Sequence, residues 1–310
     1  MAVRFHIPGL ARTFNVNMVL LMLMQEYPDQ FREGVSVGSF YGEFPTSLWN
    51  GGIRSAAGFR EEDAEYVIRE LNGRGIAVRY TFTNPLVNQN HLNDAWCNRC
   101  MKLANTADAK NGVIVASPVL EKHLRAKYPG FRYISSDAKQ ITDFDALCAE
   151  LEKYDTVLVD YNFNSDLEKL GTLPHKERAE LLVNCVCPPE CPRRKGHIQY
   201  LARTQTAYAQ HVARFGANAA FRNPESFQCP YLENTFYDLS ENPTFLSPET
   251  VFEKLVPMGF TEFRIEGRWS SPLSCAETCL QYLAKPEYRD ALRLKYLLNL
   301  EQNGIYRFEG

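Results

Sequence analysis

The stretch EEDAEYVIRELNGRGIAVRYTFTN, Glu61–Asn84, joins two local patterns that together decide the fold. Its first part repeats apolar residues at the spacing of one buried helix face, at Ala64, Val67, Ile68 and Leu71. Acidic residues open this helix, and Gly73 or Gly75 can close it. The second part, from Ile76, is rich in β-branched and aromatic residues and predicts a buried strand. A helix that leads directly into a strand is the repeating unit of an α/β protein.

The same alternation recurs along the chain. Eight short runs predict strands, which begin near Val3, Val35, Ile76, Gly112, Phe131, Thr156, Ala179 and Phe260. Amphipathic segments lie between most of them, and DFDALCAELEKY, Asp143–Tyr154, is a clear example. Eight strands that alternate with helices predict an α/β fold, a (β/α)8 barrel of the TIM type. An open doubly wound sheet is the alternative, and it would be preferred if two of the strands proved false.

The length of 310 residues is generous for one barrel and leaves room for an insertion. We expect a single barrel domain, 1–310, with a cysteine-bearing insertion at 186–258 between the seventh and eighth strands. This insertion contains a helix-like run, His197–Phe215, and then an irregular stretch rich in Pro, Asn and Phe.

Composition and charge narrow the class of protein. Apolar residues make up 45% and charged residues 23%, as in globular proteins. The net charge of -3 gives no electrostatic reason to expect nucleic-acid binding. The apolar run Met18–Met24 is too short to span a membrane, so we expect a buried helix and a cytoplasmic protein.

Nine cysteines without a signal peptide argue against a disulfide framework and favour metal or redox chemistry.

Polar residues follow almost every predicted strand, at the end where a barrel carries its chemistry. The candidates for substrate binding are Arg54, Asn84, Asn90, Asn162, Asn184, Arg194, Glu266 and Arg268. Arginine can clamp a carboxylate or phosphate, so we expect a small anionic substrate. Loop capping or local ion pairing is the alternative role for each. Asp160, which ends the apolar run TVLVD, and His197 are the candidates for acid–base catalysis.

The segment NCVCPPECPRRKGH, Asn184–His197, concentrates cysteines, prolines and basic residues; we call it the cysteine segment. Its thiols and a later one could bind a [4Fe–4S] cluster through Cys185, Cys187, Cys191 and Cys229. Zinc is the alternative cofactor, although a structural zinc site usually takes two close cysteine pairs. A catalytic thiol with His197 as base is the third possibility.

Two motifs resemble those of peptidase U32-like proteins. LLVNCVCPPECPRRKGH looks like the Asn-x-x-Cys-x-x-x-Cys-Pro-x-Arg-x-x-His segment of that family, and FTEFRIEGR is similar to its late Phe-(Lys/Arg)-Ile-x-Gly-Arg element. The matching positions are Asn184, Cys187, Cys191, Arg194, His197, Ile265, Gly267 and Arg268, and Cys229 matches a downstream cysteine. The resemblance implies a TIM-type barrel with a [4Fe–4S] cluster. It also implies either peptidase activity or oxygen-independent hydroxylation, in some members with prephenate as oxygen donor.

The fourth cluster ligand is left open by the motifs. In the most similar members the position of Cys185 is more often acidic, and the other candidates are Cys97, Cys275 and Cys279. These last three lie in helix-like stretches, where core packing is the more common role. We therefore expect an iron–sulfur-dependent redox enzyme for a small anionic substrate, served by an electron donor or a partner subunit. A hydrolase and a non-catalytic scaffold are the alternatives.

Overall fold

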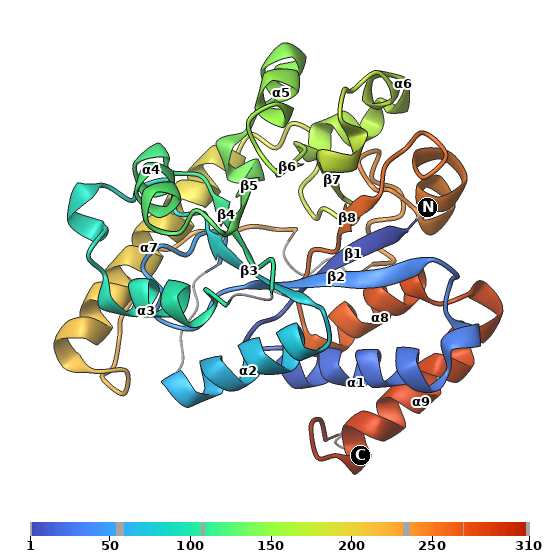
Figure 1. The fold of residues 1–310 in the computed structure, drawn as a ribbon, viewed down its shortest axis with the longest axis horizontal. Helices are drawn as coiled ribbons and strands as arrows, with labels where there is room; N and C mark the ends of the chain where they lie inside the picture. The colour runs from blue at the N-terminus through green and yellow to red at the C-terminus, as the bar shows by residue number, and fades with distance from the viewer. Residues whose placement is uncertain (1, 54–58, 107–108, 232–235, 269, 308–310) are drawn as a thin grey trace.

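The computed structural model describes residues 2–53, 59–106, 109–231, 236–268 and 270–307, and within them eight parallel strands close into a barrel (Figure 1). The strands are β1 Val3–Pro8, β2 Val35–Gly42, β3 Ala77–Phe82, β4 Gly112–Val115, β5 Arg132–Ser135, β6 Thr156–Leu158, β7 Ala179–Leu182 and β8 Glu262–Arg264. Each strand pairs with its neighbours in sequence, and β8 closes the barrel by pairing with β1. The predicted (β/α)8 barrel is confirmed, and the doubly wound alternative is wrong.

Helices cover the outside of the barrel. They are α1 Phe14–Glu26, α2 Glu61–Gly73, α3 Ala95–Leu103, α4 Pro118–Lys127, α5 Phe144–Leu151, α6 Leu167–Gly171, α7 Arg194–Phe215, α8 Pro272–Leu283 and α9 Arg289–Gln302. Short helical turns are η1 Pro28–Gln30, η2 Gln89–His91, η3 Asp137–Lys139, η4 Tyr161–Ser165, η5 Lys176–Arg178, η6 Thr250–Leu255 and η7 Pro286–Tyr288. Helices α1, α8 and α9 pack side by side on one flank (Figure 1).

Helix α2 ends as its sequence predicts. Gly73 is its last residue, and Gly75 adopts the left-handed backbone with φ of 73° that turns the chain into β3. Glycine takes this conformation without the steric penalty of a Cβ atom. The buried face is the predicted one, with Ala64, Val67, Ile68 and Leu71 in the core.

The long connection between β7 and β8 carries α7, which packs against the loops that follow β2 and β3. Gln205 donates to the carbonyl of Ser47 at 2.8 Å, and Asn84 donates to the Thr206 hydroxyl at 3.0 Å. The insertion therefore packs against the end of the barrel where the strands terminate.

Four cysteines outside the cysteine segment belong to the core. Cys97 and Cys100 on α3, and Cys275 and Cys279 on α8, are all buried in the main apolar cluster. The N-terminal apolar run lies in α1 and packs against the same core. No helix of the described ranges is long and apolar enough to cross a membrane.

Candidate functional site

A cavity of about 140 Å³ opens at the carboxyl ends of the strands. Its walls include Thr81, Thr83, Asp137, Tyr161, Cys185, Cys187, Arg194, His197, Cys229, Arg264, Glu266 and Arg268. We call it the central cavity. These residues come from strand ends, the cysteine segment and the insertion, so the fold brings together residues that are far apart in sequence. The cavity therefore lies at the end of the barrel where the sequence predicts the functional residues.

A smaller space of about 60 Å³ adjoins the central cavity, and we call it the niche. Its lining is Tyr41, Gly52, Asp137, Leu182, Arg264, Glu266 and Arg268. All of these except Tyr41 also line the central cavity, so the two spaces are continuous. The niche thus places two arginines and two acids around a small volume.

Arg264 is the unusual group of the niche. Its Nε donates to Glu180 Oε1 at 2.8 Å, and its guanidinium lies 3.9 Å above the centre of the Tyr41 ring. The residue is only 6% exposed. Its Nη2 is buried and finds no hydrogen-bond partner within the part of the chain that the structure describes. We call this Nη2 the available donor, because a buried nitrogen of this kind normally requires an acceptor.

Below Arg264, the interior of the barrel holds a network of charged side chains. Glu180 Oε2 accepts from Arg79 Nη1 at 2.5 Å, and His6 Nε2 lies 2.7 Å from Glu262 Oε2. Burial alone would raise the pKa of Glu180, but His6, Arg79 and Arg264 lower it to about 2. Burial and the nearby charge of Arg79 lower the pKa of His6.

The buried charges of this network balance. Arg79 and Arg264 pair with Glu180, and Glu262 contacts His6 and Arg4. The Arg4 side chain is 45% exposed, so water solvates its charge. The described residues of the network thus hold two buried cations, Arg79 and Arg264, and two buried anions, Glu180 and Glu262, and buried charges are tolerated when they are paired. What distinguishes Arg264 is its Nη2, which has no acceptor among the described residues.

Arg268, a predicted substrate-binding residue, lines both spaces but is firmly held. Its Nη1 donates to Glu43 at 2.9 Å and to Thr81 at 2.9 Å, and its Nη2 donates to the carbonyl of Gly51 at 3.0 Å. Its ion pair is with Glu43. Gly52 adopts a φ of 82°, and a Cβ atom there would lie 2.2 Å from Arg268 Nη2. Glycine at this position makes room for the arginine.

Asp160, the predicted acid–base residue, is instead bound to Arg194. The Arg194 Nη1 donates to Asp160 Oδ2 at 2.5 Å, and its Nη2 donates to the carbonyl of Asp137 at 3.0 Å. Burial opposes the charge of Arg194, but Asp137 and Asp160 together raise the pKa of its guanidinium. The second oxygen of Asp160 caps η4 by accepting from the Asn162 backbone at 3.1 Å. In this structure Asp160 positions Arg194, which does line the cavity.

His197 lies where the sequence places it, in the wall of the central cavity. Its ring stacks on Phe227, with centroids 4.6 Å apart and an interplanar angle of 5°. Burial lowers the pKa of His197, so the imidazole is neutral at pH 7. A neutral imidazole can donate one hydrogen bond and accept another.

Two of the predicted asparagines serve as braces between segments. Asn84 is fully buried and donates to the Leu48 carbonyl at 2.9 Å. Asn184 donates to the Glu266 carbonyl at 3.0 Å and accepts from the Glu266 backbone at 2.7 Å, so it joins the ends of β7 and β8. Glu266 in turn accepts from the Val186 backbone at 3.2 Å and supports the cysteine segment.

Two further predicted residues, Asn90 and Asn162, do not line the central cavity. Asn90 is exposed on η2, where its backbone donates to the Asn88 side chain at 3.0 Å. Asn162 lines a neighbouring cavity of about 520 Å³. Arg54 falls outside the described residues.

The four predicted cluster ligands divide between two cavities. Cys185, Cys187 and Cys229 line the central cavity, whereas Cys191 lines the neighbouring one, which shares Tyr161 and Arg194 with it. Burial raises the pKa of Cys185 well above its ordinary value, and a hydrogen bond from Cys185 lowers the pKa of Cys187.

The cysteine segment is held in place by contacts with other elements. Tyr161 donates to the carbonyl of Pro188 at 3.1 Å, and Asn242 donates to that of Cys187 at 3.2 Å. Among the described residues, no group of three or more His, Cys, Asp or Glu side chains is arranged to hold a single metal ion. Three thiols beside an arginine nevertheless fit a thiolate-bound iron–sulfur cluster in the chemistry of the donors.

Sequence reasoning overlooked Arg264, Asp137 and Tyr161. The signal for Arg264 is present, because it is a charged residue between Phe263 and Ile265, on the same strand as the charged Glu262. A charge in such a strand must face a partner or a ligand.

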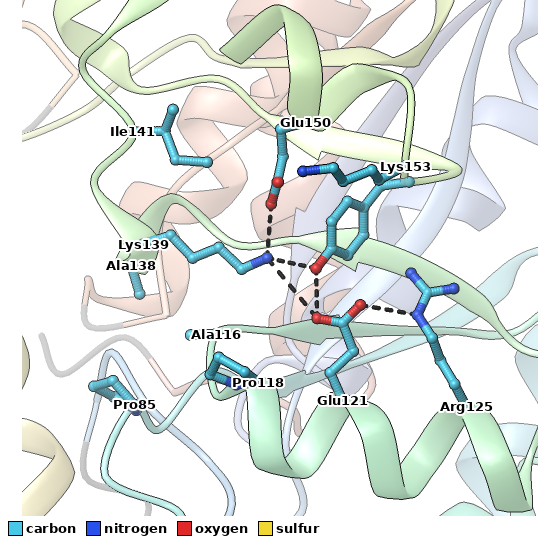
Figure 2. Close-up of a pocket in the computed structure, with 11 residues that line it drawn as sticks. Pro85, Ala116, Pro118, Glu121, Arg125, Ala138, Lys139, Ile141, Glu150 and Lys153 are labelled. Carbon is cyan, nitrogen blue, oxygen red and sulfur yellow. Dashed lines mark hydrogen bonds and ion pairs between the residues drawn. The ribbon is translucent and has the colours of Figure 1, made fainter. Parts of the chain in front are cut away.

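A larger outer cavity of about 720 Å³ lies between α4 and α5 (Figure 2). Lys139 Nζ lies 2.7 Å from Glu150 Oε1 and 2.6 Å from the Tyr154 hydroxyl, which in turn donates to Glu121. Figure 2 shows these groups directed toward one another across the cavity. They satisfy each other, whereas the available donor of Arg264 does not have such a partner among the residues described. The central cavity is therefore the better candidate site.

The chain was compared with protein-family models, curated proteins and solved structures. No protein-family model matches it, and no curated protein does. Among solved structures, that of the U32 peptidase Mk0906 is similar, with 16% sequence identity and a TM-score of 0.49. The match covers 86% of this chain and 94% of that chain.

Proposed function

We propose that the central cavity binds a small molecule through a carboxylate and that the chain is an iron–sulfur-dependent enzyme that modifies this molecule by redox chemistry. The observation that carries the proposal is Arg264, a buried arginine that lines the niche and whose Nη2 has no acceptor among the described residues. A ligand carboxylate in the niche would accept from the guanidinium of this arginine.

The size of the niche supports a small acidic group. Its volume of about 60 Å³ is roughly twice the 30 Å³ that one water molecule occupies in the liquid. A carboxylate can enter it, while the rest of the molecule extends into the central cavity toward the thiols. Arg264 would thus orient the substrate with its acid group at β8 and its other end toward Cys185 and Cys187.

The cluster is the second element of the proposal. Cys185, Cys187 and Cys229 would hold it, because these thiols share the central cavity. When bound, such a cluster supplies one-electron chemistry, and an external electron donor would then be required. Arg194 stands beside the thiols and would offset the negative charge of a thiolate-bound group. His197 could hold or transfer a proton at its neutral imidazole.

The anion site is tested by thermal unfolding in sodium malonate and in sodium chloride of equal ionic strength. A ligand that binds the folded chain raises its unfolding temperature. We expect malonate to stabilise the wild-type protein and to have little effect on Arg264→Gln. Arg293→Gln, which alters an arginine on α9, is the matched control and should respond like wild type. Equal responses of wild type and Arg264→Gln would contradict the proposal.

The cluster is tested on protein purified without oxygen, by iron and sulfide content and by visible absorption. We expect a brown protein with about four irons, which Cys187→Ser and Cys229→Ser lose and which Cys148→Ser, on α5, retains. A colourless protein with one tightly held zinc would refute the cluster. If an activity is found and survives loss of the iron, the chain is a hydrolase of the kind the family label suggests. If bulky residues in the niche alter stability alone, it is a scaffold.

A further inference from the structure

We propose that Glu180 and Tyr41 are positioning residues that fix Arg264 and thereby determine where the ligand's carboxylate binds. The inference rests on the proposed function and deepens it, because it explains how a buried arginine that lines the niche is held in one orientation. Neither residue needs to perform chemistry on the ligand. Their effect is exerted through the guanidinium that they hold.

The first step concerns how Glu180 is shared. An arginine can bind a carboxylate through two parallel hydrogen bonds, and Nε and Nη2 form one edge of the guanidinium that does so. Arg264 makes only the Nε bond, to Glu180 Oε1 at 2.8 Å. The other oxygen, Oε2, accepts from Arg79 Nη1 at 2.5 Å. Glu180 therefore holds Arg264 through Nε and Arg79 through Nη1, while Arg264 Nη2 has no acceptor among the described residues.

The second step concerns the Tyr41 ring. The guanidinium of Arg264 lies 3.9 Å from the ring centre, and the Tyr41 hydroxyl donates to the carbonyl of Ile265 at 2.7 Å. Ile265 is the next residue after Arg264, so the ring is anchored to the same stretch of chain that it supports. A cation over an aromatic face is attracted to it and is also restricted to one plane.

Together these contacts fix both the plane and the rotation of the guanidinium. The Nε bond sets the direction of the edge, and the ring sets the plane. The guanidinium that lines the niche therefore has one fixed orientation before any ligand arrives. Preorganisation of this kind raises affinity, because the side chain loses little freedom on binding.

Glu180 also provides a way to distinguish positioning from simple electrostatics. Removal of a buried negative charge near an anion site raises the local positive potential. If Glu180 acted through its charge alone, Glu180→Gln would bind an anion more tightly. If Glu180 positions Arg264, the same variant binds the anion more weakly, because an amide cannot accept from both arginines.

The experiment measures malonate affinity by isothermal titration calorimetry, with the folded state of each variant checked by circular dichroism. We expect Glu180→Gln and Tyr41→Leu to bind malonate at least fivefold more weakly than wild type. Tyr41→Phe keeps the ring and should recover most of the affinity lost in Tyr41→Leu.

Two controls match these changes. Glu262→Gln removes another buried carboxylate of the network, which contacts Arg4 and His6. Tyr133→Leu removes another buried tyrosine beneath an arginine, that of Arg125 at 4.2 Å. Both should change malonate affinity less than twofold.

The outcomes separate the two proposals. If wild type does not bind malonate, or Arg264→Gln binds it equally well, the proposed anion site itself fails. If wild type binds, Arg264→Gln does not, and Glu180→Gln and Tyr41→Leu bind like wild type or more tightly, only the positioning role is refuted. If Glu180→Gln does not fold, the comparison of Tyr41→Leu with Tyr41→Phe decides the inference.

Discussion

Replacement of Asp160 by asparagine separates the role that the sequence suggests for this residue from the one that the structure gives it. Asparagine keeps the side-chain oxygen that caps η4 through the Asn162 backbone. It removes the charge that pairs with Arg194 at 2.5 Å. Asp160 is 1% exposed, so this charge is buried with its partner.

The expected loss of stability follows from the geometry of the pair. Removal of one member of a buried ion pair costs about 3–5 kcal/mol. The Arg194 side chain is 10% exposed and keeps its bond to the Asp137 carbonyl at 3.0 Å, which moderates the effect. We therefore expect a decrease in the free energy of unfolding of about 2–3 kcal/mol, and a fall in the unfolding temperature of roughly 3–5 °C.

Urea unfolding followed by far-ultraviolet circular dichroism measures this decrease. A double-mutant cycle with Arg194→Met should give a coupling energy of at least about 1 kcal/mol between the two residues. Asp143→Asn is the matched control, because this exposed aspartate caps α5 in the same way and asparagine keeps the capping oxygen. A stability of Asp160→Asn within about 0.5 kcal/mol of wild type, with no coupling to Arg194, would refute the positioning role of Asp160.

Three further changes have defined outcomes. The pKa of Glu180 is about 2 in the folded chain, below its ordinary value of 4.5. Its contribution to the free energy of unfolding is therefore complete above pH 4.5 and is lost as the pH falls toward 2. Unfolding measured across this range should show a loss of roughly 3 kcal/mol, and Glu180→Gln should show a smaller loss. Asn184→Ala removes both bonds to the Glu266 backbone and should lower the unfolding free energy in urea by about 2–4 kcal/mol. Gly52→Ala places a methyl group against Arg268 at a φ of 82°, and should cost about 1–3 kcal/mol of stability and weaken malonate binding. An unchanged urea midpoint in either of these last two variants would contradict its argument.

The strands were predictable because their signals are local. β4 and β6 are short apolar runs, and each is bounded by residues that favour turns or helix starts. Even β8, with three residues, is found, because FTEFRIEGR is preceded by a helical segment and a glycine. A parallel barrel strand is covered on its outer face by a helix and filled on its inner face by side chains, so its apolar pattern is dense. Their order around the barrel then follows from the alternation with helices.

The roles of the polar strand-end residues were not predictable in the same way. Asn84 bonds to Thr206 and Asn184 to Glu266, and each pair is separated by a long stretch of chain. The sequence indicates that these asparagines end strands, and such a position suits both a ligand and a brace. Whether such an asparagine binds a ligand or braces two segments depends on which residue lies next to it. The closed barrel brings these distant residues together, and the local sequence pattern does not reveal them.

The role of Arg264 was more predictable than the roles of the strand-end asparagines and less predictable than the strands. Side chains alternate along a strand, so Glu262 and Arg264 share one face and Phe263 takes the other. Charges on the inner face of a barrel must find partners there, which makes the charges of other strands, Arg79 and Glu180, their expected neighbours. Arg264 and Arg79 do pair with Glu180. The sequence thus indicates the partners of Arg264, and the structure adds that this arginine lines the niche with an Nη2 that has no acceptor among the described residues.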